Sequence, residues 1–243
     1  MRTRRAHAIM CASFALFLGL CSASANAACR QALALGLDVS GSVDSREYRL
    51  QLDGLANALV HPEVAKALLS MAETPVALAV YEWSGPTDQR IILPWREVTD
   101  TTTLTTISDI LRNTKRAPLD PSTAIGSALR FGIALLGDKP MCWKRTLDIS
   151  GDGKSNTGPD VQTVQRSLPP AITVNGLVIG ADTLDAQDRR MMEIGELISY
   201  YGAVVISGPD AFVESALGFD AFEAAMVRKL KRELQGIVIG QLR

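Results

Sequence analysis

The chain has 243 residues, of which 47% are hydrophobic and 21% charged, and its formal net charge at pH 7 is −1. This length suits one α/β domain with a sizeable core. The near balance of charge, without any basic run, argues against nucleic acid as a partner.

The first 27 residues have the three parts of a cleaved secretory signal. Three arginines begin the segment, the apolar run Ile9–Leu20 follows, and Ala25-Asn26-Ala27 forms the cleavage signal. The apolar run is shorter than the roughly 20 residues of a membrane span, and no later segment is long enough to cross a bilayer. We therefore predict that residues 1–27 are removed. Residues 28–243 would then form one domain in the periplasm or outside the cell, with no stable membrane insertion.

The mature chain keeps two of the four cysteines. Cys11 and Cys21 leave with the signal, whereas Cys29 and Cys142 remain. An even pair in an oxidising compartment predicts a disulfide. Each of these two cysteines precedes a predicted strand, so both lie at the same edge of the sheet if those strands are parallel.

The first half of the chain alternates between predicted strands and helices. Residues 30–37 predict a strand that the apolar run Leu33–Leu37 marks as buried, and a helix over 45–60 carries apolar residues on one face. A short helix over 63–70 follows. The run 76–83 is apolar until Glu82 and predicts a central strand. After a Gly–Pro turn, 90–95 predicts an edge strand, because Pro94 cannot donate to a ladder.

The second half continues the same alternation. A helix around 104–111 precedes a loop, and Ser122 is the expected N-cap of the next helix, which carries Ile125, Leu129, Ile133 and Leu136. The remaining predicted elements are a strand at 145–149, a helix at 161–168, a strand at 172–179, a helix at 187–200, a strand at 203–206 and a helix at 210–234. The fold class is therefore α/β: a doubly wound, mostly parallel six-stranded sheet with one antiparallel edge strand and helices on both faces.

Oxygen-bearing side chains gather where the first strand ends. Asp38, Ser40 and Ser42 fall on alternate positions between this strand and the next helix. Open α/β sheets bind their ligands at such strand ends, and one carboxylate with two hydroxyls suits a hard cation. The alternative is a simple turn in which Asp44 caps the helix and Glu47 completes a capping box, and the two interpretations are compatible.

Two other loops offer similar ligands. Thr123 lies at the head of the helix over 125–136, and Asp152 follows the strand over 145–149. In a doubly wound sheet the strands that end at Asp38 and Asp152 can be neighbours, which would place both carboxylates at one crevice.

These five residues resemble the metal-ion-dependent adhesion site of von Willebrand factor type A domains, in which the ligands come in this order from three loops. The resemblance covers essentially the whole mature chain. It implies that Ser40, Ser42 and Thr123 bind Mg²⁺ or Mn²⁺ directly, and that Asp38 and Asp152 act mainly through coordinated waters. It also implies an open position on the cation that accepts a carboxylate from a partner protein.

Four further stretches are similar to a bacterial family of secreted A-type proteins known only as a domain of unknown function. They are Glu82–Gly85, Leu147–Gly153, Val174–Leu177 and Ser207–Val213. This narrower resemblance implies no activity of its own. The prediction is therefore a non-enzymatic, metal-dependent, adhesion-type protein-binding module.

Two other functions stay open: a metal-assisted hydrolase of the phosphatase type, favoured by the Asp38/Asp152 pair, and an envelope-assembly subunit with a structural metal. A haloacid-dehalogenase-type phosphatase would need a second Asp where Ser40 stands. A phosphate loop around Lys154 would need Gly in place of Asp148. Serine hydrolysis would need a general base, and the only mature histidine is His61, between two predicted helices.

Several charged and aromatic residues have structural interpretations instead. Asp148 is a carboxylate inside an apolar strand, and we expect it to brace neighbouring loops, since a buried charge must be paired. Trp83 and Trp95 lie near strand ends, where they could form a binding rim, but packing is the expectation for such large aromatic side chains. The terminal helix is expected to expose a solvated cationic face to water, formed by Arg228, Lys229, Lys231 and Arg232.

Overall fold

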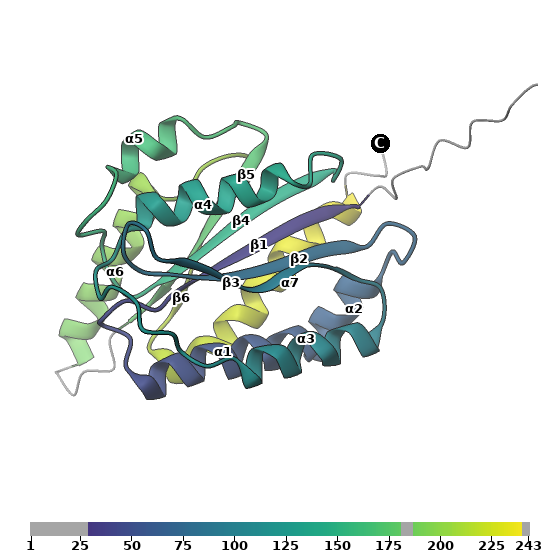
Figure 1. Ribbon diagram of the computed structural model, residues 1–243, viewed down its shortest axis with the longest axis horizontal. Coiled ribbons are helices and arrows are strands. Elements are labelled where there is room, and N and C mark those ends of the chain that lie inside the picture. The colour runs from purple at the N-terminus through teal and green to yellow at the C-terminus, as the bar shows by residue number, and fades with distance from the viewer. Residues whose placement is uncertain (1–28, 181–186, 240–243) are drawn as a thin grey trace, which may run out of the picture.

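The computed structural model describes residues 29–180 and 187–239 (Figure 1). Its strands form one six-stranded sheet in the order β3-β2-β1-β4-β5-β6, with β3 antiparallel and the others parallel. Helices cover both faces of the sheet, so the predicted fold class is confirmed. The predicted signal, residues 1–27, lies outside the described residues. The strands are β1 (Gln31–Asp38), β2 (Val76–Trp83), β3 (Gln89–Val98), β4 (Lys144–Gly151), β5 (Ile172–Ile179) and β6 (Val213–Ala216).

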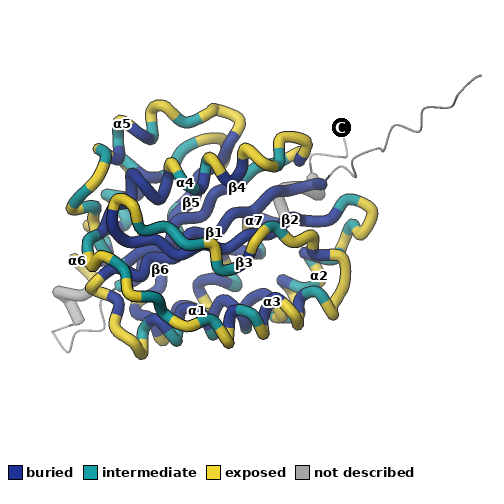
Figure 2. Tube along the Cα trace, in the orientation of Figure 1, coloured by how far each residue is buried: buried dark blue, intermediate teal, exposed yellow. Residues whose placement is uncertain are grey.

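The helices divide into two layers. Those on one face are α1 (Ser45–Val60), α2 (Pro62–Leu69), α3 (Thr101–Asn113) and α7 (Phe222–Ile239), and those on the other are α4 (Ile125–Gly137), α5 (Val161–Arg166) and α6 (Gln187–Val204). Figure 2 shows the strands as the buried centre and the helices exposing their outer sides.

The sequence of β1 matches this two-sided burial. Leu33, Leu35 and Leu37 point into the core beneath α1 and α7, whereas Ala32 and Ala34 belong to the core beneath α4. Successive side chains of a strand alternate between faces, so the small residues leave room on the α4 side for large aromatic rings contributed by β2. All eight residues of β1 are buried, and the strand lies in the middle of the sheet. The loop that follows β1 therefore also begins at the middle of the sheet.

The edge strand β3 is longer than predicted and contains an irregularity. Its register against β2 shifts between Leu78 and Val80, which pair with Arg96 and Leu93. The shift falls at Pro94, which has no N–H to contribute to the ladder. The predicted edge position of this strand is confirmed.

Two predicted elements near the C-terminus are wrong. The residues over 203–206 do not form a strand, because α6 continues to Val204 and both Val205 and Ile206 donate backbone hydrogen bonds to the carbonyl of Tyr201. The sixth strand is β6, and the terminal helix begins at Phe222 instead of residue 210. Because β6 has only four residues and pairs with β5 alone, its local sequence carries too little periodicity to separate it from a helix.

The end of the sheet opposite the metal loops holds the disulfide. Cys29 and Cys142 are joined across 113 residues, with their Cα atoms 4.6 Å apart. Backbone hydrogen bonds from Trp143 to Cys29 and from Lys144 to Arg30 continue into the β1–β4 ladder. The disulfide therefore ties the beginnings of the two strands whose other ends carry the predicted metal residues.

A buried ion cluster lies between the sheet and α7. The Nζ atom of Lys229 is 2.6 Å from Asp148 Oδ1 and 2.7 Å from Glu233 Oε1, and Asn175 Nδ2 donates to Glu233 Oε1 at 2.6 Å. The prediction that Lys229 belongs to a solvated face is therefore wrong: its side chain is fully buried. Asp148 braces α7 rather than loops. Burial raises its pKa, and the ammonium of Lys229 opposes that shift.

The predicted packing role of both tryptophans is confirmed. Trp83 is fully buried, and the half-buried Trp95 donates from Nε1 to the carbonyl of Leu135. Among the described residues, no helix is long and apolar enough to cross a membrane.

Candidate metal centre

The first loop leaves β1 at Asp38, whose side chain is fully buried. Its Oδ1 atom accepts a hydrogen bond from the backbone N–H of Ser40 at 2.8 Å, and its carbonyl accepts one from Gln51 Nε2 at 2.9 Å. The predicted capping box is present, because Asp44 accepts from the N–H of Glu47 and Glu47 accepts from the N–H of Asp44. The cap uses none of the predicted metal residues, so a cap and a metal site can exist together in this loop.

Four of the five predicted metal residues form a continuous chain of contacts. The hydroxyls of Ser40 and Ser42 lie 3.2 Å apart, and Ser42 Oγ donates to Asp152 Oδ1 at 2.7 Å. Asp152 is close because β1 and β4 are adjacent and parallel, with Leu37 opposite Ser150. The predicted neighbourhood of the two strands is confirmed, and with it the meeting of their carboxyl ends.

Hydrogen bonds connect the loop of Thr123 to the other two loops. The N–H of Gly41 donates to the carbonyl of Pro121 at 2.7 Å, and the N–H of Thr123 donates to Asn156 Oδ1 at 2.9 Å. Thr123 itself is buried at the head of α4. The predicted capping role of Ser122 is wrong. The N-cap of α4 is Ala124, and the Ser122 hydroxyl donates to Asp120.

The two carboxylates stand in an environment that favours their neutral forms. Burial and the nearby charge of Asp152 raise the pKa of Asp38 to about 7, although hydrogen bonds from Ser40 and the charge of Arg116 oppose the shift. Burial also raises the pKa of Asp152. The Oδ2 atom of Asp38 is buried and has no hydrogen-bond partner among the described residues. A cation at this point would offset both the burial and the mutual repulsion.

The donor set fits a hard divalent cation. It consists of three hydroxyls and two carboxylates, and oxygen ligands of this kind suit Mg²⁺ or Mn²⁺. The described part of the chain holds no cluster of three or more His, Cys, Asp or Glu side chains. The five candidate ligands are hydroxyls and carboxylates, whereas softer metals prefer imidazole and thiolate groups.

Residues outside the predicted set support the loops. Arg116 donates to the carbonyls of Val43, Val39 and Ser40 at 2.6, 3.0 and 3.1 Å. These hydrogen bonds fix the backbone of the first loop. The sequence does not show that three carbonyls of this loop are the target of an arginine.

Gly151 is required by a close approach at the end of β4. A Cβ atom at this position would lie 2.5 Å from the hydroxyl of Tyr201 and 2.9 Å from Asp38 Oδ2. The buried Tyr201 hydroxyl has no hydrogen-bond partner among the described residues. Tyr201 and Asp38 therefore converge on the same glycine, a juxtaposition that the sequence did not indicate.

The raised pKa of Asp38 predicts a pH dependence of folding in the presence of a chelator. Between its ordinary pKa, near 3.8, and about 7, the folded protein holds a proton that the unfolded chain lacks. Stability should therefore fall as pH rises through this range and level off above it. Asp38→Asn should match wild type below about pH 4 and exceed it near pH 8 by up to about 4 kcal/mol, at about 1.4 kcal/mol per pKa unit.

Urea unfolding at a series of pH values, with chelator, measures this difference. Adding Mg²⁺ should reverse it at pH 8, because the cation stabilises only the carboxylate of the wild-type protein. Parallel pH profiles for wild type and Asp38→Asn would contradict the prediction.

Known structures share this fold over most of the chain. The pilus adhesin SpaC from Lactobacillus rhamnosus GG aligns with 86% of this chain and 31% of its own, at 15% identity and a TM-score of 0.58. A von Willebrand factor type A protein from Catenulispora acidiphila aligns with 86% of this chain and 43% of its own, at 15% identity and a TM-score of 0.53.

Proximal thread matrix protein 1 from the mussel byssus, in a structure with a zinc-occupied MIDAS motif, aligns with 86% of this chain and 46% of its own. The identity is 14% and the TM-score 0.55. The chain thus spans less than half the length of each of these three proteins, and at these identities the likeness shows the fold. A search of curated proteins gives no match. The family model described as a protein of unknown function, DUF1194, matches residues 28–238, and the chain therefore belongs to this family and has the fold of a von Willebrand factor type A domain.

Proposed function

We propose that this protein is an exported, adhesion-type module that binds a partner protein through a divalent cation at the carboxyl edge of its sheet. Ser40, Ser42 and Thr123 would supply neutral ligands, and Asp38 and Asp152 would act through coordinated waters. The observation that carries the proposal is the contact among the three loops, together with Asp38, whose buried Oδ2 has no hydrogen-bond partner among the described residues.

The chemistry of the donor set suggests what the cation would bind. Neutral direct ligands leave Mg²⁺ or Mn²⁺ with much of its charge, and an open position then favours an anionic ligand. A carboxylate from a partner protein meets this requirement. The adhesin and the byssus protein with its occupied MIDAS motif are consistent with such a role.

Cation binding should depend on Asp38. In a thermal melt, Mg²⁺ or Mn²⁺ should raise the melting temperature of wild type and leave that of Asp38→Ala unchanged, because the alanine variant lacks the carboxylate that holds the coordinated water. Asp53→Ala is the matched control, since Asp53 lies on α1 and pairs with Arg49 at the surface. Absence of a metal-dependent shift in wild type would contradict the metal role.

Partner binding should depend on the same cation. Affinity capture from envelope and secreted extracts should recover a protein with wild type in Mg²⁺, and lose it in chelator or with Asp38→Ala. The fraction that yields the partner would also test the proposed export, because an exported protein should find its partner in the envelope or in the secreted material. Capture that survives chelation would favour instead an assembly subunit with a structural metal.

A metal-assisted hydrolase is the second candidate, because the carboxylates of Asp38 and Asp152 lie close enough to raise the pKa of Asp38. It has the weaker support among the described residues, since His61 lies at the junction of α1 and α2. The 16 residues of α1 separate it from the metal loops by about 24 Å. Turnover of phosphoesters or peptides that disappears in Asp38→Asn would establish this candidate.

A further inference from the structure

We propose that Asn156 is a positioning residue for Thr123, holding this ligand in place for the cation from the loop that also carries Asp152. The inference rests on the proposed function, because it concerns how the same metal site is preorganised. It assigns a role to a residue that no metal-binding motif includes.

Asn156 holds the backbone of Thr123 on both sides. The N–H of Thr123 donates to Asn156 Oδ1 at 2.9 Å, and the N–H of Asn156 donates to the carbonyl of Thr123 at 2.9 Å. Two hydrogen bonds in opposite directions fix both the position and the orientation of this peptide segment. The second loop is thereby attached to the third loop at the residue whose hydroxyl is a predicted metal ligand.

The neighbouring Ser155 completes the attachment. Its Oγ accepts from the N–H of Ile125 at 3.2 Å, and its single proton is within reach of the carbonyls of Thr123 at 3.2 Å and Thr157 at 3.3 Å. The N-cap of α4, Ala124, has no side-chain oxygen to cap the helix. Ser155, from the third loop, therefore caps the first turn of α4 in place of an N-cap side chain.

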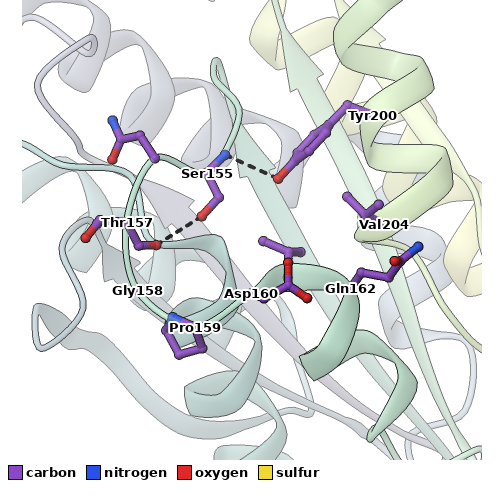
Figure 3. A pocket seen from close by; sticks show the side chains of 10 residues that line it. Ser155, Thr157, Gly158, Pro159, Asp160, Gln162, Tyr200 and Val204 are labelled. Carbon is purple, nitrogen blue, oxygen red and sulfur yellow. Dashed lines mark hydrogen bonds between the residues drawn. The ribbon is translucent and has the colours of Figure 1, made fainter.

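The third loop is also held from its other side. The N–H of Ser155 donates to the hydroxyl of Tyr200 at 3.3 Å, and Figure 3 shows this contact across a pocket between the loop and α6. The pocket has a volume of about 370 Å³ and is lined by residues 155–162, Tyr200 and Val204. The loop segment that positions Thr123 is therefore attached to α6.

Preorganisation matters here because the direct ligands are neutral hydroxyls. Each binds a cation weakly compared with a carboxylate, so affinity depends on presenting all of them together. Residues that orient the ligands of a metal typically change affinity by about 10–100-fold when they are replaced. Asn156 is exposed, so replacing it removes no core packing.

The test compares Asn156→Ala with Thr157→Ala, the adjacent position in the same loop. Titration calorimetry with Mn²⁺ should show about 10–100-fold weaker binding for Asn156→Ala and unchanged binding for Thr157→Ala. Thermal melts in chelator should be similar for both variants and for wild type, which separates positioning from a general loss of stability.

A conservative variant provides the rescue. Asn156→Asp keeps an acceptor for the N–H of Thr123 and should recover most of the affinity. Thr157→Asp adds the same charge without that acceptor and, combined with Asn156→Ala, should not recover it. Equal Mn²⁺ affinity in wild type and Asn156→Ala would overturn the positioning role and leave the proposed function intact. Absence of Mn²⁺ binding in wild type would overturn both.

Discussion

Lys229→Met should destabilise the folded protein by about 3–5 kcal/mol at pH 7, because it leaves two buried carboxylates without their cation. Lys229 is fully buried and contacts both Asp148 and Glu233. Burial lowers the pKa of its ammonium, but the two carboxylates more than offset this and the pKa is raised. The side chain is therefore charged in the folded state. Urea unfolding measured by circular dichroism gives the loss directly.

The same helix supplies a matched control. Lys231 lies 2.6 Å from Glu63 at the surface, where side-chain exposures are 32% and 60%. Lys231→Met should change stability by less than about 1 kcal/mol, since solvent screens exposed pairs. A loss for Lys229→Met no larger than this would contradict the structural role of the cluster.

A second substitution tests the cause. Asp148→Asn removes one of the two charges that Lys229→Met leaves unpaired, so the double variant should be more stable than the sum of the single losses predicts. Residues in contact commonly show coupling energies of about 0.5–3 kcal/mol. Additive losses would indicate that packing of the lysine stem, rather than its charge, holds α7 against the sheet.

The second large effect is expected from the disulfide. Replacing both Cys29 and Cys142 by serine should lower the free energy of unfolding by about 4–5 kcal/mol, because the bond closes a loop of more than a hundred residues in the unfolded chain. Guanidinium unfolding of oxidised wild type and the double serine variant measures the difference.

Reduction supplies the control for this prediction. Dithiothreitol should shift the unfolding midpoint of wild type and leave that of the double serine variant unchanged. Because the disulfide lies at the end of β1 and β4 opposite the metal loops, the variant should keep its Mg²⁺-dependent stabilisation while it remains folded. A loss below about 1 kcal/mol would mean that the unfolded chain is already compact in this region.

Local sequence patterns predict the central part of the sheet correctly. Strands buried on both faces, such as Val76–Trp83 and Ile172–Ile179, are recognisable because apolar residues dominate over the length of a strand, with Glu82 and Asn175 as exceptions. The cysteine pair follows from counting once the predicted signal is set aside. The candidate metal residues follow from their position after the strands and from the resemblance to the adhesion site, and their binding of a cation stays a prediction.

The tertiary structure decided what depends on contacts distant in sequence. Lys229 has the local pattern of a solvated helix face and is buried because Asp148, 81 positions earlier, meets it across β4. The strand β6 exists because β5 offers it an edge. The start of α4 is held by Ser155, 30 positions away, where local sequence suggested Ser122. In each case the contacting residue or strand is distant in sequence. Periodicity and capping patterns describe only neighbouring residues, so they cannot predict such a contact.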